Sequence, residues 1–267
     1  MLEPRIIDEI AQRLDVAEKS RQRIRPPSAQ YPGMTIEDAY AVQRKWVALK
    51  LAAGRTIKGH KIGLTSKAMQ NISNVKEPDY GALLDDMFFT DGGDIPMARF
   101  IEPRLECELA FIMGRRLKGP NCTIFDALAA TDYITPTVEI VDLRTMNVDP
   151  ETKAGRTVID NIADNAANAA LVMGGRPVKP DAIDMRWAAC LCYRNGAIEE
   201  SGVAAAVLNH PANGIAWLAN KLAPFEVALE PGQIVLAGSF TRVVPARAGD
   251  QFFIDYGPLG SISCRFV

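Results

Sequence analysis

Three glutamates stand inside segments that are otherwise built from apolar residues. Glu106 and Glu108 lie in the run 104–113, and Glu139 lies in the run 137–141. An ionised carboxylate is costly to bury unless it is paired or bound to a cation, and Arg104 is the one basic residue in the two runs. The two runs therefore predict either a buried divalent-cation site or a sheet edge with its glutamates in water.

The i, i+2 spacing of Glu106 and Glu108 favours a strand over a helix. On a β-strand the two side chains leave the same face about 7 Å apart, whereas on a helix they diverge. All-oxygen ligands suit Mg²⁺ or Mn²⁺, and no His or Cys stands at zinc-ligand spacing. The pattern alone leaves open the alternative of an exposed strand whose glutamates are solvated.

The composition is that of an ordinary globular protein that acts on a small molecule. The 267 residues are 48% hydrophobic, enough for a large core. A formal net charge of −2 without a Lys/Arg block argues against nucleic acid or an anionic membrane as partner. Five cysteines without a C-x-x-C pair, and no apolar run of roughly 20 residues, lead us to expect a cytoplasmic protein with reduced thiols.

The order of predicted elements indicates an α+β fold with helices first and sheets after. Apolar residues at helical spacing predict a helix over 5–24, and a capped start at 35–38 predicts a second helix that ends near Gly54. Short β-rich runs follow over 82–113 and 133–143. We therefore expect a helical N-terminal subdomain, 1–60, and a β-rich catalytic domain, 61–267.

Residues typical of turns and helix caps predict further helices and strands in the second half of the chain. Thr123 and Asp126 predict a helix start, and Asn195-Gly196 predicts a hairpin turn. A helix is expected over 211–221, because proline suits a first turn. The segment 233–267 is expected to form a series of strands.

A glycine-flanked basic segment, 58–66, contains His60 and Lys61. It fits either an anion-binding loop or a basic surface loop. Lys61 could hold a carboxylate or move a proton, since an amine near a metal and away from bulk water can have a lowered pKa.

Three other polar segments are weaker signals. Residues 77–81, with Asp79, read first as a turn. The amide-rich stretch 160–169 is expected to satisfy buried backbone. Residues 238–242 fit ordinary turn chemistry and ligand contacts equally well.

Taken together, these segments resemble the hydratase/decarboxylase branch of the fumarylacetoacetate hydrolase superfamily. The resemblance runs in order over nearly the whole chain. The segments that carry it are 59–67, 77–81, 106–108, Glu139, 164–168, 208–214, 238–241 and the ending 260–267.

The resemblance implies a mixed, multi-layer, rolled β core with a helical N-terminal part. It implies Mg²⁺ or Mn²⁺ on Glu106, Glu108 and Glu139, and a homo-oligomer, a decamer built from dimers. The lid histidine and glutamate of the superfamily's C–C hydrolases have no counterpart before residue 60. That departure argues against hydrolysis.

The implied activity is addition of water to a 2-oxo diacid, 2-oxohept-4-ene-1,7-dioate, in homoprotocatechuate catabolism. The product would be 4-hydroxy-2-oxoheptanedioate. Alternatives are hydration of a 2-hydroxypenta-2,4-dienoate-type monoacid, decarboxylation of a 4-oxalocrotonate-type diacid, and a noncatalytic partner subunit.

The same hypothesis assigns roles to individual residues. Lys61 is the leading candidate for proton transfer, Asp79 is its partner base or orients the water, and His60 supports Lys61. The expected substrate contacts are Leu64, Thr65, Ser239 and Thr241.

Overall fold

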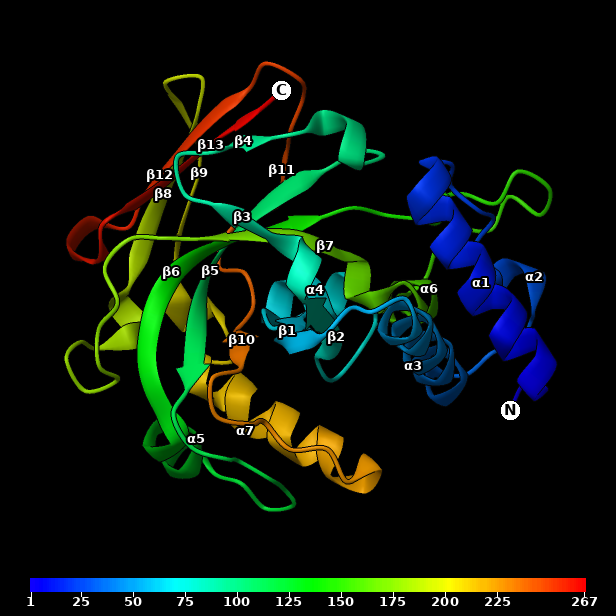
Figure 1. Cartoon of the computed structure of the whole chain (residues 1–267), viewed down its shortest axis with the longest axis horizontal. Helices are drawn as coiled ribbons and strands as arrows, with labels where there is room; N and C mark the ends of the chain where they lie inside the picture. The colour runs from blue at the N-terminus through cyan, green and yellow to red at the C-terminus, as the bar shows by residue number, and fades with distance from the viewer.

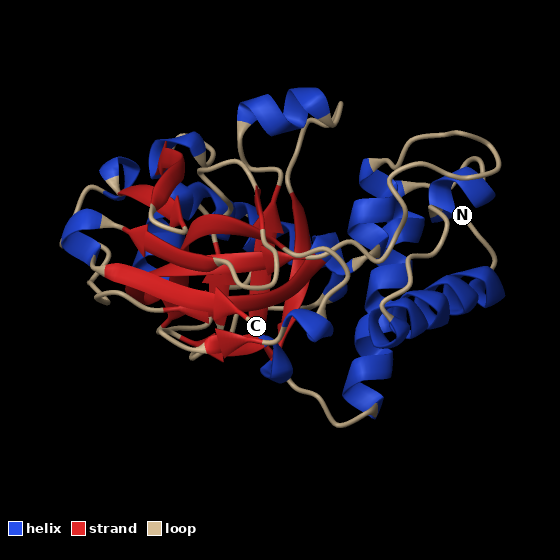
Figure 2. Ribbon diagram, turned by 90° about the horizontal axis from the view of Figure 1, so that it is seen from above, coloured by secondary structure: helices blue, strands red, loops and turns tan.

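A computed structural model describes residues 1–267 and shows a lobe of N-terminal helices beside two layers of strands (Figures 1 and 2). The predicted α+β class, with a rolled β core and a helical N-terminal part, is confirmed. One cluster of 60 buried apolar residues runs through the molecule and includes Leu14 and Trp46 of the helices as well as Leu109 and Leu236 of the sheet. The helical lobe and the sheets thus share a core.

The N-terminal helices begin and end close to the predicted positions. Helix α1 buries Ile10, Leu14 and Ala17 at helical spacing and packs on α3. Thr35 and Asp38 form the predicted capping box at the start of α3. The helices are α1 Pro4–Ser20, α2 Pro27–Gln30, α3 Ile36–Ala52, α4 Lys67–Ile72, α5 Ile124–Ala130, α6 Val158–Ala163 and α7 Pro211–Leu222.

The larger sheet has eight strands in the order β2-β1-β10-β5-β6-β7-β3, and β11 pairs with β5. Its longest antiparallel pair, β5 with β6, forms the tall green strands of Figure 1. The strands are β1 Ile57–Gly63, β2 Asp79–Leu84, β3 Phe88–Thr90, β5 Arg104–Met113, β6 Thr131–Val141, β7 Asn168–Met173, β10 Ile234–Leu236 and β11 Val244–Pro245.

The smaller sheet has five strands in the order β4-β13-β12-β8-β9. The predicted hairpin is confirmed, since Asn195 and Gly196 both have positive φ and join β8 to β9. These strands are β4 Asp94–Ile95, β8 Ala189–Arg194, β9 Ala197–Val203, β12 Gln251–Asp255 and β13 Ser261–Phe266.

Curvature of the larger sheet brings distant strands together. Three strand spacings separate β1 from β6, roughly 14 Å in a flat sheet. Nevertheless, Nζ of Lys61 on β1 lies 3.2 Å from Oε1 of Glu139 on β6. The sheet therefore curls across the face that carries these side chains.

Two sequence interpretations are wrong. The basic segment is no surface loop, because Ile57–Gly63 forms β1 and both His60 and Lys61 are buried. Asp79, predicted to lie in a turn, instead begins β2, where it is buried. β1 is held between β2 and β10, and β2, at the edge of the sheet, packs against the 165–167 turn and α6.

Candidate active site

Three glutamates converge on one face of the β5–β6 pair. Glu106 pairs directly with Glu139 across the two strands, and Glu108 follows two residues along β5. Their ligand oxygens all lie within 4.8 Å of one another. The predicted strand and shared face are confirmed. The alternative of solvated glutamates is wrong, because Glu108 and Glu139 are at most 1% exposed.

The electrostatics of this cluster fit a divalent cation. Burial raises the pKa of Glu106 to about 7, and the charge of Glu139 adds to the rise. Burial raises the pKa of Glu108 as well, and repulsion from the charges of Glu139 and Glu106 raises it further. Glu108 Oε1 and Glu139 Oε2 have no hydrogen-bond partner. Three converging carboxylates with unpartnered oxygens are a donor set suited to Mg²⁺ or Mn²⁺.

Neighbouring groups orient the other oxygen of the two deepest glutamates. The amide N–H of Gly238 donates to Glu108 Oε2 at 2.8 Å, and Asn168 Nδ2 donates to Glu139 Oε1 at 2.7 Å. Such contacts hold a ligating carboxylate in one rotamer. The two glutamates are therefore fixed before any ligand arrives.

Lys61 extends from β1 into the same cluster. Its Nζ lies 3.2 Å from Glu139 Oε1 and donates to the carbonyl oxygen of Ala166 at 3.0 Å. Burial alone would lower the pKa of Lys61, but attraction by Glu139 and Asp79 outweighs burial and raises it. Against these carboxylates the side chain is an ammonium ion, and the lowered pKa expected beside a bound metal ion stays a prediction.

Asp79 faces Lys61 from the adjacent strand. In the antiparallel β1–β2 pair it lies opposite Gly63. Its Oδ2 accepts a hydrogen bond from Asn161 Nδ2 at 2.7 Å, whereas its buried Oδ1 has no partner. One oxygen is thus fixed, and the other is left without a hydrogen-bond partner.

The absence of a side chain at Gly63 leaves room for the carboxylate of Asp79. A Cβ at Gly63 would lie 2.3 Å from Asp79 Oδ1 and 3.2 Å from Lys61 Nζ. We expect Gly63→Ala to displace Asp79 and to lower kcat by about 100-fold, because small misplacements at a reacting centre have effects of that size. Steady-state kinetics with thermal unfolding would measure this.

The matched control is Gly155→Ala, whose added methyl group meets no atom within 4 Å. It should keep kcat near the wild-type value. A Gly63→Ala enzyme with wild-type kcat would contradict a catalytic role for Asp79.

His60 lies on the opposite side of β1 from Lys61, since alternate side chains of a strand point to opposite faces. It does not line the cavity that contains Lys61. Burial lowers the pKa of His60 to about 4, so the imidazole is neutral at neutral pH. The structure does not bring His60 to the reacting groups, and a supporting contact to Lys61 is not found.

This placement predicts a stability effect for His60 without a catalytic one. Its pKa in the folded protein lies below the ordinary 6.5. The free energy of unfolding should therefore fall as pH drops from about 6.5 to 4, by up to about 3 kcal/mol from this residue. Compared with wild type, His60→Gln should lose that part of the pH dependence and keep kcat within about threefold. A tenfold loss of kcat would contradict this placement.

A cavity of about 770 Å³ opens over these groups. Lys61, Asp79 and Glu106 line one part of it, together with Leu64. Leu64 has a positive φ of 55°, a conformation that non-glycine residues rarely adopt. The cavity has the size of a small-molecule site.

The other three expected substrate contacts do not line this cavity. Thr65 is buried against Gly238. The Thr241 hydroxyl accepts from the backbone N–H of Cys107 at 3.2 Å, and the Ser239 hydroxyl donates to the Thr241 carbonyl at 2.9 Å. These hydroxyls tie the 238–241 segment to β5, beside the glutamates.

The amide-rich stretch supplies contacts that the sequence interpretation missed. Asn165 does satisfy buried backbone, through two hydrogen bonds with Ala82. Asn161 and Asn168 instead hold Asp79 and Glu139. The high amide content was the available signal, but nothing in it indicated carboxylates as partners.

A left-handed turn presents a carbonyl group to Lys61. Asn165, Ala166 and Ala167 have φ values of 51°, 51° and 60°. Such conformations cost roughly 1 kcal/mol or more at a non-glycine residue. Arg144, in an ion pair with Asp164 at 2.7 Å, donates to the Asn168 carbonyl at 2.6 Å and so braces the segment.

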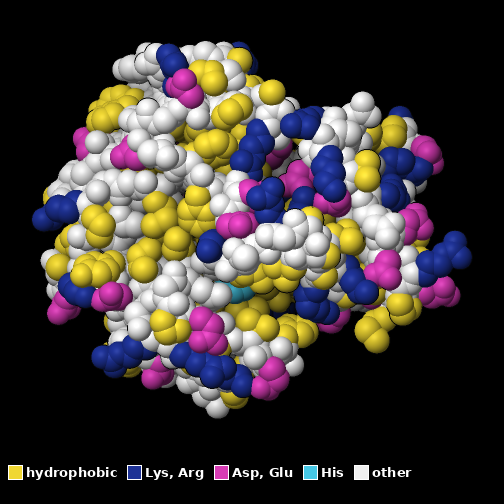
Figure 3. All heavy atoms as spheres, viewed as in Figure 1, with side chains coloured by type: hydrophobic (Ala, Val, Ile, Leu, Met, Phe, Trp, Pro, Cys, Tyr) yellow, Lys and Arg dark blue, Asp and Glu magenta, His cyan; other side chains and the backbone are white.

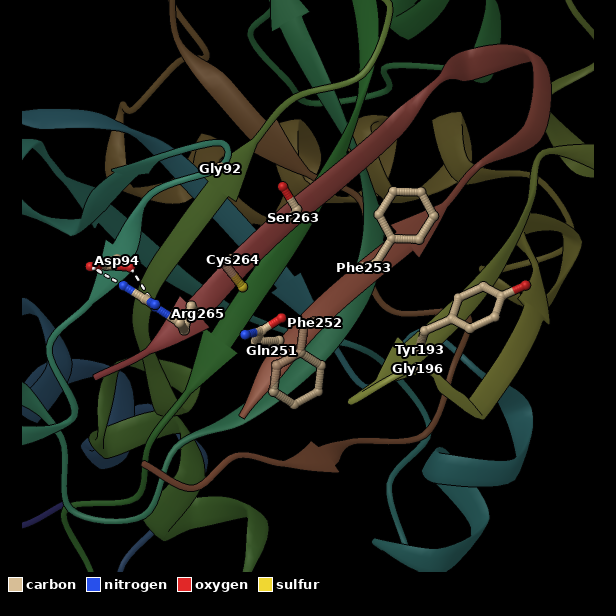
Figure 4. Close-up of a pocket in the computed structure, with 10 residues that line it drawn as sticks. All are labelled: Gly92, Asp94, Tyr193, Gly196, Gln251, Phe252, Phe253, Ser263, Cys264 and Arg265. Atoms are coloured by element: carbon tan, nitrogen blue, oxygen red, sulfur yellow. Dashed lines mark hydrogen bonds and ion pairs between the residues drawn. The ribbon is translucent and has the colours of Figure 1, made fainter. Parts of the chain in front are cut away.

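A second hollow, of about 540 Å³, lies on the smaller sheet (Figure 4), and none of the three glutamates lines it. Its charged side chains, Asp94 and Arg265, pair with each other at 2.8 and 2.9 Å. Its lining contains no cluster of acids. The chemistry of the molecule is therefore concentrated in the larger cavity.

Known proteins share both the sequence and the fold. The chain is 68% identical over 258 residues to 2-oxo-hept-4-ene-1,7-dioate hydratase of Escherichia coli, covering 97% of each chain. It is 38% identical to 2-hydroxyhexa-2,4-dienoate hydratase of Comamonas testosteroni, over the full length of both.

A solved structure superposes on nearly all of the fold. It is 4-oxalocrotonate decarboxylase from Pseudomonas putida G7, complexed with magnesium and adipate. The TM-score is 0.94 at 35% identity, over 100% of this chain and 99% of the other. Residues 51–267 also match the family model of the fumarylacetoacetate (FAA) hydrolase C-terminal region. The chain belongs to the fumarylacetoacetate hydrolase family.

Proposed function

We propose that this protein is a divalent-metal-dependent hydro-lyase. It adds water to 2-oxohept-4-ene-1,7-dioate and forms 4-hydroxy-2-oxoheptanedioate, a step of homoprotocatechuate (4-hydroxyphenylacetate) catabolism. The observation that carries this proposal is the 68% identity with a hydratase of that name over 97% of both chains. Relatives named as decarboxylases are only 36% identical.

Glu106, Glu108 and Glu139 would hold the Mg²⁺ or Mn²⁺ ion. When bound, the ion supplies an electrophile for the 2-oxo acid end of the substrate. The glutamates contribute by converging from two strands with unpartnered oxygens. Their fixed partners, Gly238 N–H and Asn168, keep that geometry without further rearrangement.

Proton movement is assigned to Lys61 and Asp79. The reaction removes a proton from C3 and places one on C5, which moves the double bond to C3–C4. Water then adds its hydroxyl at C4 and its proton at C3. Asp79, with its free Oδ1, accepts the C3 proton, and the Lys61 ammonium ion stabilises negative charge on the substrate.

The test is turnover by the purified protein alone in ¹⁸O-labelled water. We expect a product heavier than the substrate by one water molecule, with one heavy oxygen at C4. Release of CO₂ would instead identify a decarboxylase. Turnover of a monoacid but not of the diacid would identify a monoacid hydratase. Turnover that requires a second protein would identify a noncatalytic partner subunit.

The enzyme is assigned to the cytoplasm on the strength of its five free cysteines. None of its helices is long and apolar enough to cross a membrane. On the face shown in Figure 3, basic and acidic side chains are interspersed over the helical lobe, and no extended field of one sign covers it. This surface fits the proposed small-molecule substrate.

A homo-oligomer is proposed as well, a decamer built from dimers. Its support is the outer face of the smaller sheet, where Tyr193 and Phe253 project (Figure 4), their ring centroids 6.0 Å apart. Tyr193 is half-buried, whereas Phe253, Trp187 and Ile198 are exposed. Exposed apolar side chains in such number are typical of an interface. Light scattering should give the mass of ten chains, and a monomeric mass would contradict this assembly.

A further inference from the structure

Two arginines line the active-site cavity without a close carboxylate partner. Arg156 donates through Nε to Thr145 Oγ1 and through Nη2 to Asn161 Oδ1, both at 2.8 Å, and it forms no ion pair. Arg104 has a buried Nε without a hydrogen-bond partner. Its one acidic neighbour, Glu102, lies 3.6 Å away and is bound more closely by Arg23, at 2.6 Å.

The two guanidinium groups line the same cavity. Burial lowers the pKa of Arg156, attraction by Asp164, Asp160 and Asp79 opposes this lowering, and the positive charge of Arg104 adds a smaller contribution to it. Two like charges held close together in a partly buried cavity repel each other. An anion between them would relieve this repulsion and satisfy their free N–H groups.

Their position relative to the glutamates fits the far end of a short substrate. Arg104 lies two residues before Glu106 on β5, so both point to the same face with Cα atoms roughly 7 Å apart. Arg156 is joined through Asn161 to Asp79. The arginines therefore lie beside the reacting groups. A short diacid with its 2-oxo acid end at the glutamate cluster could reach them with its other carboxylate.

We propose that Arg104 and Arg156 bind the terminal carboxylate of the 2-oxo diacid and thereby select diacids over monoacids. The inference rests on the proposed function, because it names the group that recognises the end of that substrate opposite the 2-oxo acid. A planar guanidinium binds a carboxylate through two parallel N–H donors. A site built for such a group rejects an analogue that lacks it, since the buried donors are left unpaired.

The test compares two substrates that differ only at C7: 2-oxohept-4-ene-1,7-dioate and 2-oxohept-4-enoate. We expect Arg156→Gln and Arg104→Gln each to lower kcat/KM for the diacid by about 10- to 100-fold, the effect of losing one or two hydrogen bonds to a charged group. For the monoacid, Arg104→Gln should leave kcat/KM within about threefold of wild type, and Arg156→Gln should lower it less than it lowers kcat/KM for the diacid, because Arg156 also holds Asn161.

Direct binding provides a second readout. The saturated pair 2-oxoheptanedioate and 2-oxoheptanoate lacks the double bond and cannot be hydrated. Calorimetry should show that the wild-type preference for the diacid disappears in Arg156→Gln. Arg156→Lys, which keeps the charge but loses the fork, should retain part of the preference.

The controls separate recognition from structural damage. Arg247→Gln removes an exposed arginine whose side chain makes no hydrogen bond, and it should change kcat/KM for neither substrate. Arg156 also contacts Asn161, which holds Asp79. If Arg156 acted only through that contact, turnover of both substrates would fall equally.

Equal losses for both substrates, or none for either, would overturn the arginine assignment while wild-type hydration left the proposed function standing. If the wild-type enzyme hydrated neither substrate, the proposed function itself would fail. The two failures are therefore distinguishable.

Discussion

Replacing Glu108 with glutamine is expected to lower kcat/KM for the diacid by about 1,000-fold or more. The change keeps the size of the side chain but removes a charge from the three-carboxylate cluster, and loss of metal-ion catalysis costs several kcal/mol of transition-state stabilisation. Mg²⁺ should raise the midpoint of thermal unfolding of the wild type and leave the variant nearly unchanged. Kinetics and thermal scans with and without Mg²⁺ would measure both effects.

The stability of the metal-free wild type and of metal-free Glu108→Gln should also differ. Burial and repulsion from Glu139 and Glu106 raise the pKa of Glu108, so its charged form destabilises the folded state. Metal-stripped Glu108→Gln should therefore be at least as stable as metal-stripped wild type. Glu3→Gln, a change at an exposed glutamate, should affect neither quantity. Full activity of Glu108→Gln would rule out the proposed metal site.

Replacing Lys61 with alanine is expected to lower kcat by 100- to 10,000-fold and to raise KM. The variant loses the one ammonium ion within 3.2 Å of the glutamate cluster, and positioned proton-transfer or charge-stabilising groups have effects of this size. An additional readout is exchange of the C3 protons of 2-oxoheptanedioate with deuterated water, followed by NMR. That exchange should slow together with turnover.

Lys58→Ala is the matched control, because Lys58 lies on the same strand but is exposed. It should preserve both turnover and C3 exchange. Wild-type turnover in Lys61→Ala would show that another group stabilises the developing charge. Slow turnover with wild-type C3 exchange would assign Lys61 to the addition of water only.

Local patterns predicted the elements and the glutamate face. The i, i+2 spacing of Glu106 and Glu108 predicted a strand with both side chains on one face, and the cap residues at Thr35 and Thr123 predicted the starts of two helices. These features depend on neighbours a few residues apart. A short segment of sequence therefore contains the information that determines them.

Contacts between distant segments could not be predicted in this way. Asn161 holds Asp79 from 82 residues away, and Asn168 holds Glu139 from 29 residues away. His60 and Lys61 looked like one basic pair, yet the strand directs them to opposite faces. Strand order and sheet curvature determine such contacts, and neither can be predicted from residues that are close together in the sequence.

The most direct test of the account is a metal titration of the stripped enzyme with 2-oxohept-4-ene-1,7-dioate as substrate. We expect no hydration without metal and recovery of hydration on addition of Mg²⁺ or Mn²⁺. We also expect one ion to bind per chain, and Glu108→Gln to abolish that binding. Hydration at the full rate by protein shown to be free of metal would contradict it.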